Sequence, residues 1–234
     1  MKITKLNDDS SWLIDFTETT LMIDPWFTPY QVDLASWFSI QYHKTKQPTV
    51  TDLKKPDYIF ISNPFTDHCN KETLVQFDPS IPIIGNKKVV NKIKKWGHFK
   101  ELILIENAPF EIKIFKGSNP FDLVHNAYYI QHGNESILYA PHGSKVKQVP
   151  KVNVLITTTS RYQLPFWLGG KVNLGYSAAV KLLRKTQCRI VLSSHDEQKI
   201  GRGLVEVLAK KKYVNREHVN TKIKFLLQGE TINV

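Results

Sequence analysis

The stretch ISNPFTDHCN, residues 61–70, decides how this chain folds and what chemistry it can support. It overlaps the apolar run YIFI at 58–61, which has the length and composition of a strand buried on both faces. Asp67 and His68 therefore stand in a loop directly after a strand, where scaffolds often place reactive groups. Asn70 predicts the N-cap of a helix over Lys71–Phe77.

Outward from this loop, the chain alternates between strand-rich sections and strand–helix sections. Residues 28–50 are polar, rich in aromatic residues and unperiodic, which predicts a long loop. The pattern favours an α/β (α+β) fold of two facing sheets with helices outside, in a single domain over residues 1–234. We expect strands at 2–6, 11–16, 20–23, 81–85, 102–105, 110–115, 127–131, 136–140, 152–157, 189–192, 222–227 and 231–234, and further helices at 87–96, 176–185 and 204–212.

Composition narrows the function classes. Of the 234 residues, 41% are hydrophobic, so the chain can bury a core, and no apolar run approaches the roughly 20 residues of a membrane span. The N-terminus lacks the apolar core of a secretory signal, and Cys69 and Cys188 form no CxxC pair; both features favour the cytoplasm. The net charge of +11 would attract anionic partners, among them an anionic small-molecule substrate such as a phosphorylated metabolite, nucleic acid or a membrane surface, although solvated surface lysines are the favoured explanation. Because the lysines are scattered and no nucleic-acid motif accompanies them, nucleic-acid binding is disfavoured.

Metal-ligand side chains follow three separate predicted strands. Asp67 and His68 follow YIFI, His142 lies in PHGS after ILYA, and His195 lies in SSHDE after RIVL. A single histidine is weak evidence, but the same position relative to three strands is stronger. Imidazoles with one carboxylate suit Zn²⁺, or Fe or Mn where more oxygen ligands are present.

These segments resemble the metallo-β-lactamase superfamily, nearest its small lactonase and phosphodiesterase-like branch. SSWLIDFTETTLMIDPWF is similar to the opening hairpin of that family, and ISNPFTDHCNKETL is similar to its His-x-His-x-Asp-His loop. SILYAPHGS, CRIVLSSH and LLQGETINV resemble the strand before the bridging aspartate, the strand before the last histidine and the closing hairpin. The resemblance covers almost the whole chain and implies a four-layer αββα sandwich.

The same resemblance implies a degenerate metal centre. Two histidines of the first metal site are replaced by Asn63 and Phe65, and no histidine stands near Lys116, Gly117 and Ser118, where the third is expected. The ligands of the second site are kept as Asp67, His68 and His195. The bridging aspartate is replaced by His142, which could serve as a terminal ligand. We therefore expect one ion at most, or none, with Asp67 and His142 as the catalytic groups.

The substrate side of the site is expected on other residues. Arg161, Tyr162 and Trp167 lie in the aromatic-basic loop SRYQLPFWLGG, which the resemblance places at the mouth of the site, and Arg161 could hold an anionic group bidentately. Asn63 is the fourth residue expected to contact the substrate.

Three functions compete at this stage. The preferred one is a metal-dependent hydrolase of an ester, lactone or phosphoester. The alternative is a catalytically inactive protein that binds a ligand or partner through the same mouth, and nucleic-acid binding is the least favoured. Among neighbouring groups, Asp8 and Asp9 are interpreted as turn carboxylates in preference to groups that orient an imidazole. His43 carries no assignment, and Cys69 is expected to be a buried neutral thiol.

Overall fold

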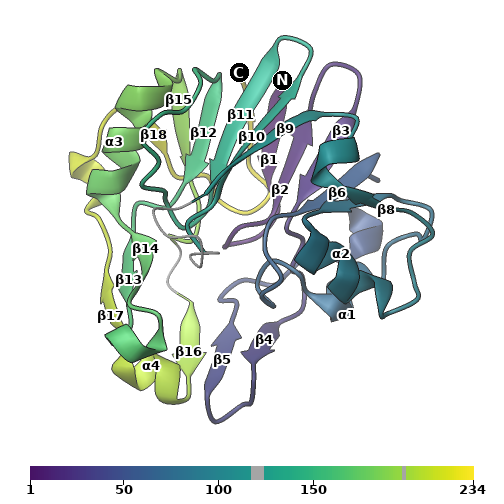
Figure 1. The fold of residues 1–234 in the computed structure, drawn as a ribbon. Coiled ribbons are helices and arrows are strands. Elements are labelled where there is room, and N and C mark those ends of the chain that lie inside the picture. The colour runs from purple at the N-terminus through teal and green to yellow at the C-terminus, as the bar shows by residue number, and fades with distance from the viewer. Residues whose placement is uncertain (117–123, 197–198) are drawn as a thin grey trace. The chain divides into compact units, whose positions relative to one another are not determined.

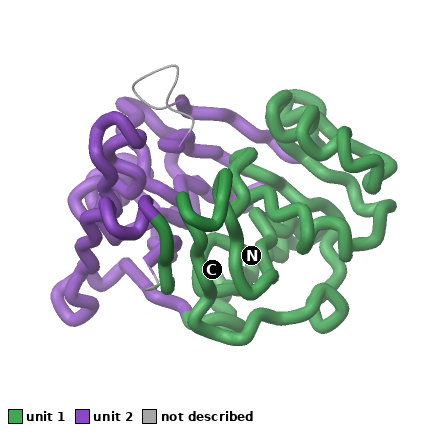
Figure 2. Tube along the Cα trace, turned by 90° about the horizontal axis from the view of Figure 1, so that it is seen from below, with its two compact units in different colours: residues 1–109, 198–203, 227–234 green, residues 110–197, 204–226 purple. Residues whose placement is uncertain are grey.

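The computed structural model describes residues 1–116, 124–196 and 199–234, and these form two compact units. Unit 1 comprises residues 1–109, 198–203 and 227–234, and unit 2 comprises residues 110–197 and 204–226 (Figure 2). Each unit has its own large sheet and its own buried cluster of apolar side chains. The expectation of a single domain over 1–234 stays a prediction.

Unit 1 is built on a seven-stranded sheet in the order β19-β1-β2-β3-β6-β7-β8 (Figure 1). The pairs from β19 to β3 are antiparallel, whereas β3, β6, β7 and β8 run parallel. The strands are β1 (Lys2–Lys5), β2 (Trp12–Asp15), β3 (Thr20–Ile23), β6 (Tyr58–Ile61), β7 (Ile83–Gly85), β8 (Leu102–Leu104) and β19 (Thr231–Asn233).

Two helices cover this sheet, and asparagine caps begin both. Helix α1 (Lys71–Leu74) is capped by Asn70, whose side chain accepts the Thr73 N–H, as predicted. Asn86 caps α2 (Lys87–Lys94) in the same way. Leu74, Val89 and Ile93 point into one apolar cluster with Met22, Ile59, Ile61 and Ile83 of the strands. Burial of these side chains, more than helix propensity, holds such short helices in place.

The prediction of a long loop over residues 28–50 is wrong. The segment contains β4 (Tyr30–Asp33) and β5 (Ser39–Tyr42), which pair with each other, and β16 (Ile200–Arg202) pairs with β5. The partner strand lies far along the chain, so the local sequence carries no signal of the pairing. Gly203 follows β16 with φ +92, and a Cβ there would meet the Phe38 carbonyl oxygen at 2.7 Å.

Unit 2 is built on a six-stranded sheet in the order β18-β15-β12-β11-β10-β9. Its strands are β9 (Glu111–Phe115), β10 (Ala127–His132), β11 (Glu135–Ala140), β12 (Val154–Thr157), β15 (Ile190–Ser193) and β18 (Ile223–Lys224). The predicted hairpin between β10 and β11 is confirmed, and the pairs from β11 to β18 are parallel. Helix α3 (Tyr176–Thr186) connects β12 to β15 and buries Leu182 and Leu183 against the sheet cluster.

A second, small sheet in unit 2 joins β13 (Arg161–Gln163) to β14 (Lys171–Leu174) and β17 (Lys210–Lys212). The prediction of one helix over 204–212 is therefore only partly right: α4 ends at Leu208, and Lys210–Lys212 pair with β13. The remaining short elements are 3-10 turns at Val50–Asp52, Ile105–Asn107, Phe166–Leu168 and Arg216–His218.

The predicted α/β class is confirmed by two large mixed sheets and few helices. In each unit, parallel strands end next to one another, and the loops that follow carry the predicted ligand side chains. Asp67 and His68 follow β6 in unit 1, and His142 and His195 follow β11 and β15 in unit 2. The helices in the described part of the chain are all too short or too polar to cross a bilayer.

Candidate metal centre

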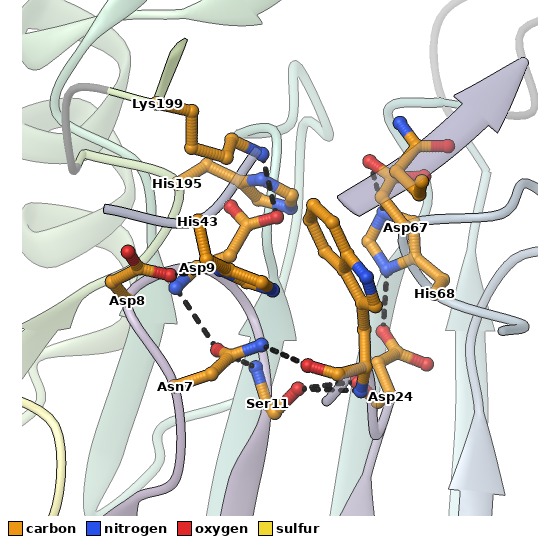
Figure 3. A network of polar contacts seen from close by, with 12 residues as sticks. Asn7, Asp8, Asp9, Ser11, Asp24, His43, Asp67, His68, His195 and Lys199 are labelled. Atoms are coloured by element: carbon orange, nitrogen blue, oxygen red, sulfur yellow. Dashed lines mark hydrogen bonds and ion pairs between the residues drawn. The ribbon is translucent and has the colours of Figure 1, made fainter. Parts of the chain in front are cut away.

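In unit 1, a buried aspartate fixes the orientation of His68. Asp24 directly follows β3, next to the end of the parallel strand β6, and its Oδ2 accepts a hydrogen bond from Nδ1 of His68 at 2.7 Å (Figure 3). The same carboxylate accepts the Ser62 N–H at 2.7 Å and the Ser62 hydroxyl at 2.5 Å. Because all three side chains are buried, the imidazole is held in one orientation.

The other ring nitrogen of His68 lies towards Asp67. Nε2 of His68 is 3.7 Å from Oδ2 of Asp67. Two ligands of one tetrahedral Zn²⁺ at about 2.1 Å lie roughly 3.4 Å apart, so this pair has nearly the spacing that a shared ion requires. The side chain of His68 is fully buried and that of Asp67 is 17% exposed. The pair therefore fits the chemistry of a divalent cation.

Electrostatics around His68 favour a positive charge at this point. Burial lowers the pKa of His68, but the carboxylates of Asp67 and Asp24 outweigh it and raise the pKa to about 9. A buried imidazole between two carboxylates thus keeps a proton at neutral pH when no metal is present. A metal cation would replace that proton, since a ligating imidazole must be neutral.

A buried ion pair lies beside this group in unit 1. Nζ of Lys199 is 2.6 Å from Oδ2 of the fully buried Asp9 and 5.2 Å from the centre of the Trp26 ring (Figure 3). Burial lowers the pKa of Lys199, but Asp9 and Asp67 outweigh it and raise the pKa above its ordinary value. Lys199 therefore stays charged and balances part of the negative charge of the carboxylates.

A second histidine of unit 1 is also oriented by a carboxylate. Nδ1 of His43 hydrogen-bonds to Oδ1 of Asp8, and the His43 ring lies 3.9 Å from that of Trp26. Burial raises the pKa of Asp8, but His43 and the Lys44 N–H outweigh it and leave the pKa below its ordinary value. Nε2 of His43 is buried and has no hydrogen-bond partner among the described residues. The interpretation of Asp8 as a turn carboxylate is therefore wrong, because it orients an imidazole.

In unit 2, the two predicted histidines come together. The rings of His142 and His195 stack with their centres 4.4 Å apart. Nδ1 of His142 donates to Oδ1 of Asn173 at 2.8 Å, so the acceptor lone pair of the neutral ring is on Nε2, the nitrogen that would bind a metal. Asn173 lies in β14, and the next residue, Leu174, donates its N–H to the His142 carbonyl at 3.0 Å.

A buried carboxylate holds the loop that carries His195. Asp196 accepts hydrogen bonds from the Thr159 N–H at 2.9 Å, the Ser160 N–H at 2.5 Å and the hydroxyls of Thr158 and Thr159. Burial raises the pKa of Asp196 above its ordinary value despite these bonds. His195 adopts a left-handed backbone conformation with φ +53, and the Ser160 hydroxyl donates to its carbonyl at 3.0 Å. These hydrogen bonds thus hold the backbone that follows this residue in place.

The expected substrate residues do not all lie in a loop. Arg161 and Tyr162 are part of β13, and the exposed Arg161 donates to Oε1 of Gln163 at 2.8 Å. Trp167 is 69% exposed in a 3-10 turn. Asn63 is buried, and its Oδ1 accepts the Phe65 N–H at 3.1 Å. The role of these residues in substrate binding stays a prediction.

Two further expectations concern the position of the family's third histidine and the thiol of Cys69. Gly117 and Ser118, where the family's third histidine is expected, lie outside the described residues. His125, the next histidine along the chain, hydrogen-bonds through Nε2 to the Val172 carbonyl at 3.0 Å. Cys69 is buried, which raises the pKa of its thiol to about 12, so the expected buried neutral thiol is confirmed.

Sequence reasoning missed the residues that orient the ligands. Asp24, Asn173 and Asp196 each come from a different loop or strand than the histidine or backbone they hold. Asp24 carried one local signal, a polar residue before Pro25 at the end of an apolar strand. No local pattern in the sequence indicated the role of Lys199, because its partner Asp9 is distant in the sequence.

Comparison with known proteins identifies the fold. A crystal structure of isothiocyanate hydrolase from Delia radicum gut bacteria matches with a TM-score of 0.70 at 15% identity, over 100% of this chain and 99% of that one. A possible metal-dependent hydrolase from Veillonella parvula matches with a TM-score of 0.70 at 14% identity, again over 100% and 99%. The metallo-beta-lactamase fold protein YhfI from Bacillus subtilis matches with a TM-score of 0.61 at 13% identity, over 99% of both chains.

Identity this low shows the fold alone, and a search of curated protein sequences gave no match. The sequence itself, however, matches a family model, that of the beta-lactamase superfamily domain, over residues 2–195. That range takes in Asp67, His68, His142 and His195. The chain therefore belongs to the beta-lactamase superfamily and has the metallo-β-lactamase fold that its sequence predicts.

Proposed function

We propose that this protein is a metal-dependent hydrolase with a single divalent cation held by Asp67, His68, His142 and His195. Asp67 and His68 lie in the loop after β6, and His142 and His195 lie in the loops after β11 and β15. Among the described His, Cys, Asp and Glu side chains, these four form a group that could hold a metal ion. The observation that carries the proposal is the Asp24–His68–Asp67 arrangement, in which a carboxylate holds one nitrogen of an imidazole and turns the other towards a second carboxylate.

The proposal is limited to one ion. Asn63 and Phe65 occupy two positions where the superfamily supplies ligands to a first ion, and Phe65 has no ligating atom. The Asn63 side chain is engaged with the Phe65 N–H, as expected of a turn residue. Three imidazoles and one carboxylate suit Zn²⁺, and they also suit Fe or Mn if water adds oxygen ligands.

A divalent cation bound here would polarise a carbonyl or phosphoryl oxygen and lower the pKa of bound water. The chain's own residues supply orientation and proton transfer. Asp24 and Asn173 orient His68 and His142, and the partly exposed Asp67 carboxylate would accept a proton from the attacking water. His142, whose Nδ1–H is held by Asn173, is the second proposed catalytic group.

The proposed substrate is an ester, lactone or phosphoester of an anionic small molecule. The net charge of +11 favours an anion. Three structural neighbours are described as hydrolases, one of them as a possible metal-dependent hydrolase, and this supports hydrolysis as the reaction class. Both cysteines are unbridged and buried, in keeping with a proposed cytoplasmic location.

Elemental analysis tests the metal directly. Protein supplied with Zn, Fe and Mn during expression should hold about one ion per chain, and His68→Ala or His195→Ala should lose it. His98→Ala is the matched control, since His98 only hydrogen-bonds to the Phe77 carbonyl. Hydrolysis of an activated ester, a lactone and a phosphodiester should then follow metal content. Absence of stoichiometric metal in folded wild-type protein would refute the proposal.

The alternative, a catalytically inactive binding protein, is favoured by the ligand positions lost at Asn63 and Phe65. It makes the opposite prediction for the same variants. If a ligand is found, Asp67→Ala and His195→Ala would leave its binding intact under this alternative. Under the hydrolase proposal, both substitutions weaken binding and abolish turnover.

A further inference from the structure

A cavity of about 390 Å³ lies within unit 2, along one face of α3. It is separate from the stacked pair of His142 and His195, neither of which lines it. Its polar and charged lining residues are Ser144, Lys145, Lys171, Ser177, Lys181 and Lys185. Its volume falls within the roughly 300–1,000 Å³ typical of small-molecule sites.

The cavity is strongly basic. Four lysines line it, and no Asp or Glu is among its lining residues, all of which are described. Lys181 and Lys185 are one turn apart on the same face of α3, and Nζ of Lys185 donates to the Val146 carbonyl. All four lysines are exposed, and a bound anion would reduce the repulsion among their positive charges.

Two features point to a hydrogen-bonding anion and not to solvated lysines alone. The side chain of Ser144 is buried, and its hydroxyl has no hydrogen-bond partner among the described residues. Helix α3 begins after Gly175 without a side-chain cap, and Ser177 and Ala178 of its first turn line the cavity, although the Ala178 N–H donates to the Gly175 carbonyl at 3.0 Å. An uncapped helix start carries partial positive charge and attracts anionic oxygens.

We infer that this cavity binds the phosphate group of a phosphorylated small molecule. A phosphate carries up to two negative charges and several acceptor oxygens, which match four ammonium groups, a serine hydroxyl and the first turn of α3. The cavity is larger than phosphate alone needs, so the rest of the molecule has room. Leu174, another lining residue, donates its N–H to the carbonyl of His142, a proposed metal ligand that does not itself line the cavity.

Phosphate binding in this cavity does not depend on the metal. The idea that a phosphorylated substrate of the enzyme occupies the cavity rests on the proposed function. The test is calorimetric titration of metal-free protein with inorganic phosphate and with pyrophosphate. We expect saturable binding of one anion per chain, weaker at higher salt. The double variant Lys171→Gln/Lys181→Gln should weaken binding at least about tenfold, and Ser144→Ala about threefold, the effect of one lost hydrogen bond.

The matched control is Lys87→Gln/Lys88→Gln, which removes the same charge from exposed positions on α2 in unit 1. It should leave phosphate affinity within about twofold, since neither lysine lines the cavity. Equal losses in both double variants would mean that net charge alone attracts the anion, and the inference would fail. Absence of saturable binding in the wild type would overturn it as well. Neither result depends on metal content, so the hydrolase proposal is tested separately.

Discussion

Nδ1 of His68 donates a hydrogen bond to Oδ2 of Asp24 at 2.7 Å, although 44 positions separate the two residues in the sequence. The parallel pairing of β3 with β6 brings them together, since Asp24 follows one strand and His68 lies in the loop after the other. The contact is fully buried. It explains how a single imidazole can be held ready for a cation without help from a second metal ion.

Asp24→Asn should weaken metal binding by about 10- to 100-fold, because an amide holds the His68 ring less firmly and makes it a poorer ligand. Competition with a chromophoric chelator measures the affinity. Asp57→Asn is the control, because Asp57 accepts bonds from Thr20 at the opposite end of β6. Circular dichroism must show that both variants fold. Wild-type metal affinity in folded Asp24→Asn protein would show that Asp24 has no part in metal binding.

Stability of the metal-free protein should fall as pH rises from about 6.5 to about 9. The pKa of His68 is about 9 in the folded state, above its reference value of 6.5. Its contribution is fully present below the unfolded pKa and is lost as pH rises through the folded pKa. The loss amounts to about 3 kcal/mol at most. Urea unfolding at several pH values measures it, and His68→Gln should flatten the profile. An equally steep profile in that variant would assign the pH dependence to other groups.

Lys199→Met should destabilise the protein by about 3 kcal/mol, since it removes the cation facing the fully buried carboxylate of Asp9. Adding Asp9→Asn should recover part of that free energy of unfolding. Lys54→Met is the matched control: Lys54 pairs with Asp15 at 2.6 Å but is 58% exposed, so its loss should cost less than about 1 kcal/mol. Similar losses in the free energy of unfolding from the two lysine variants would show that the buried Asp9–Lys199 pair stabilises the protein no more than an exposed ion pair does.

Gly203→Ala should disrupt the small sheet of β4, β5 and β16. The new Cβ would lie 2.7 Å from the Phe38 carbonyl oxygen, and the backbone has φ +92. Gly169→Ala separates the two effects, because Gly169 has φ +106 but no atom within 4 Å of the added Cβ. We expect a cost of about 1 kcal/mol for Gly169→Ala and several times that for Gly203→Ala. Thermal unfolding compares them, and equal shifts in melting temperature would show that the close contact relaxes freely.

Local patterns in the sequence predicted much of the fold and the strand ends that the proposed ligands follow. The apolar run at 58–61, the cap at Asn70 and the hairpin between β10 and β11 depend on neighbouring residues, and the structure has them as predicted. The predicted ligands Asp67, His68, His142 and His195 each follow a strand as expected. These features are short-range, so a single sequence contains enough information to find them.

What the sequence could not reveal depends on distant partners. Residues 30–42 form a hairpin in a sheet that is completed by β16, and Lys210–Lys212 form a strand because β13 is available to them. Asp8, Asp24 and Asn173 gain their roles only when folding places a histidine beside them. Hydrogen bonds between side chains of non-adjacent loops leave no periodic trace in a sequence.

Pairing of β19 with β1 has a consequence for biosynthesis. Ile232 of β19 lies opposite Ile3 of β1, so β1 keeps an open edge until the segment that forms β19 has been synthesised. The segments of unit 2 leave the exit tunnel before that happens. A nascent chain would thus carry an exposed β edge while the segments of unit 2 are synthesised, and chaperone protection of this edge against aggregation matters during that time.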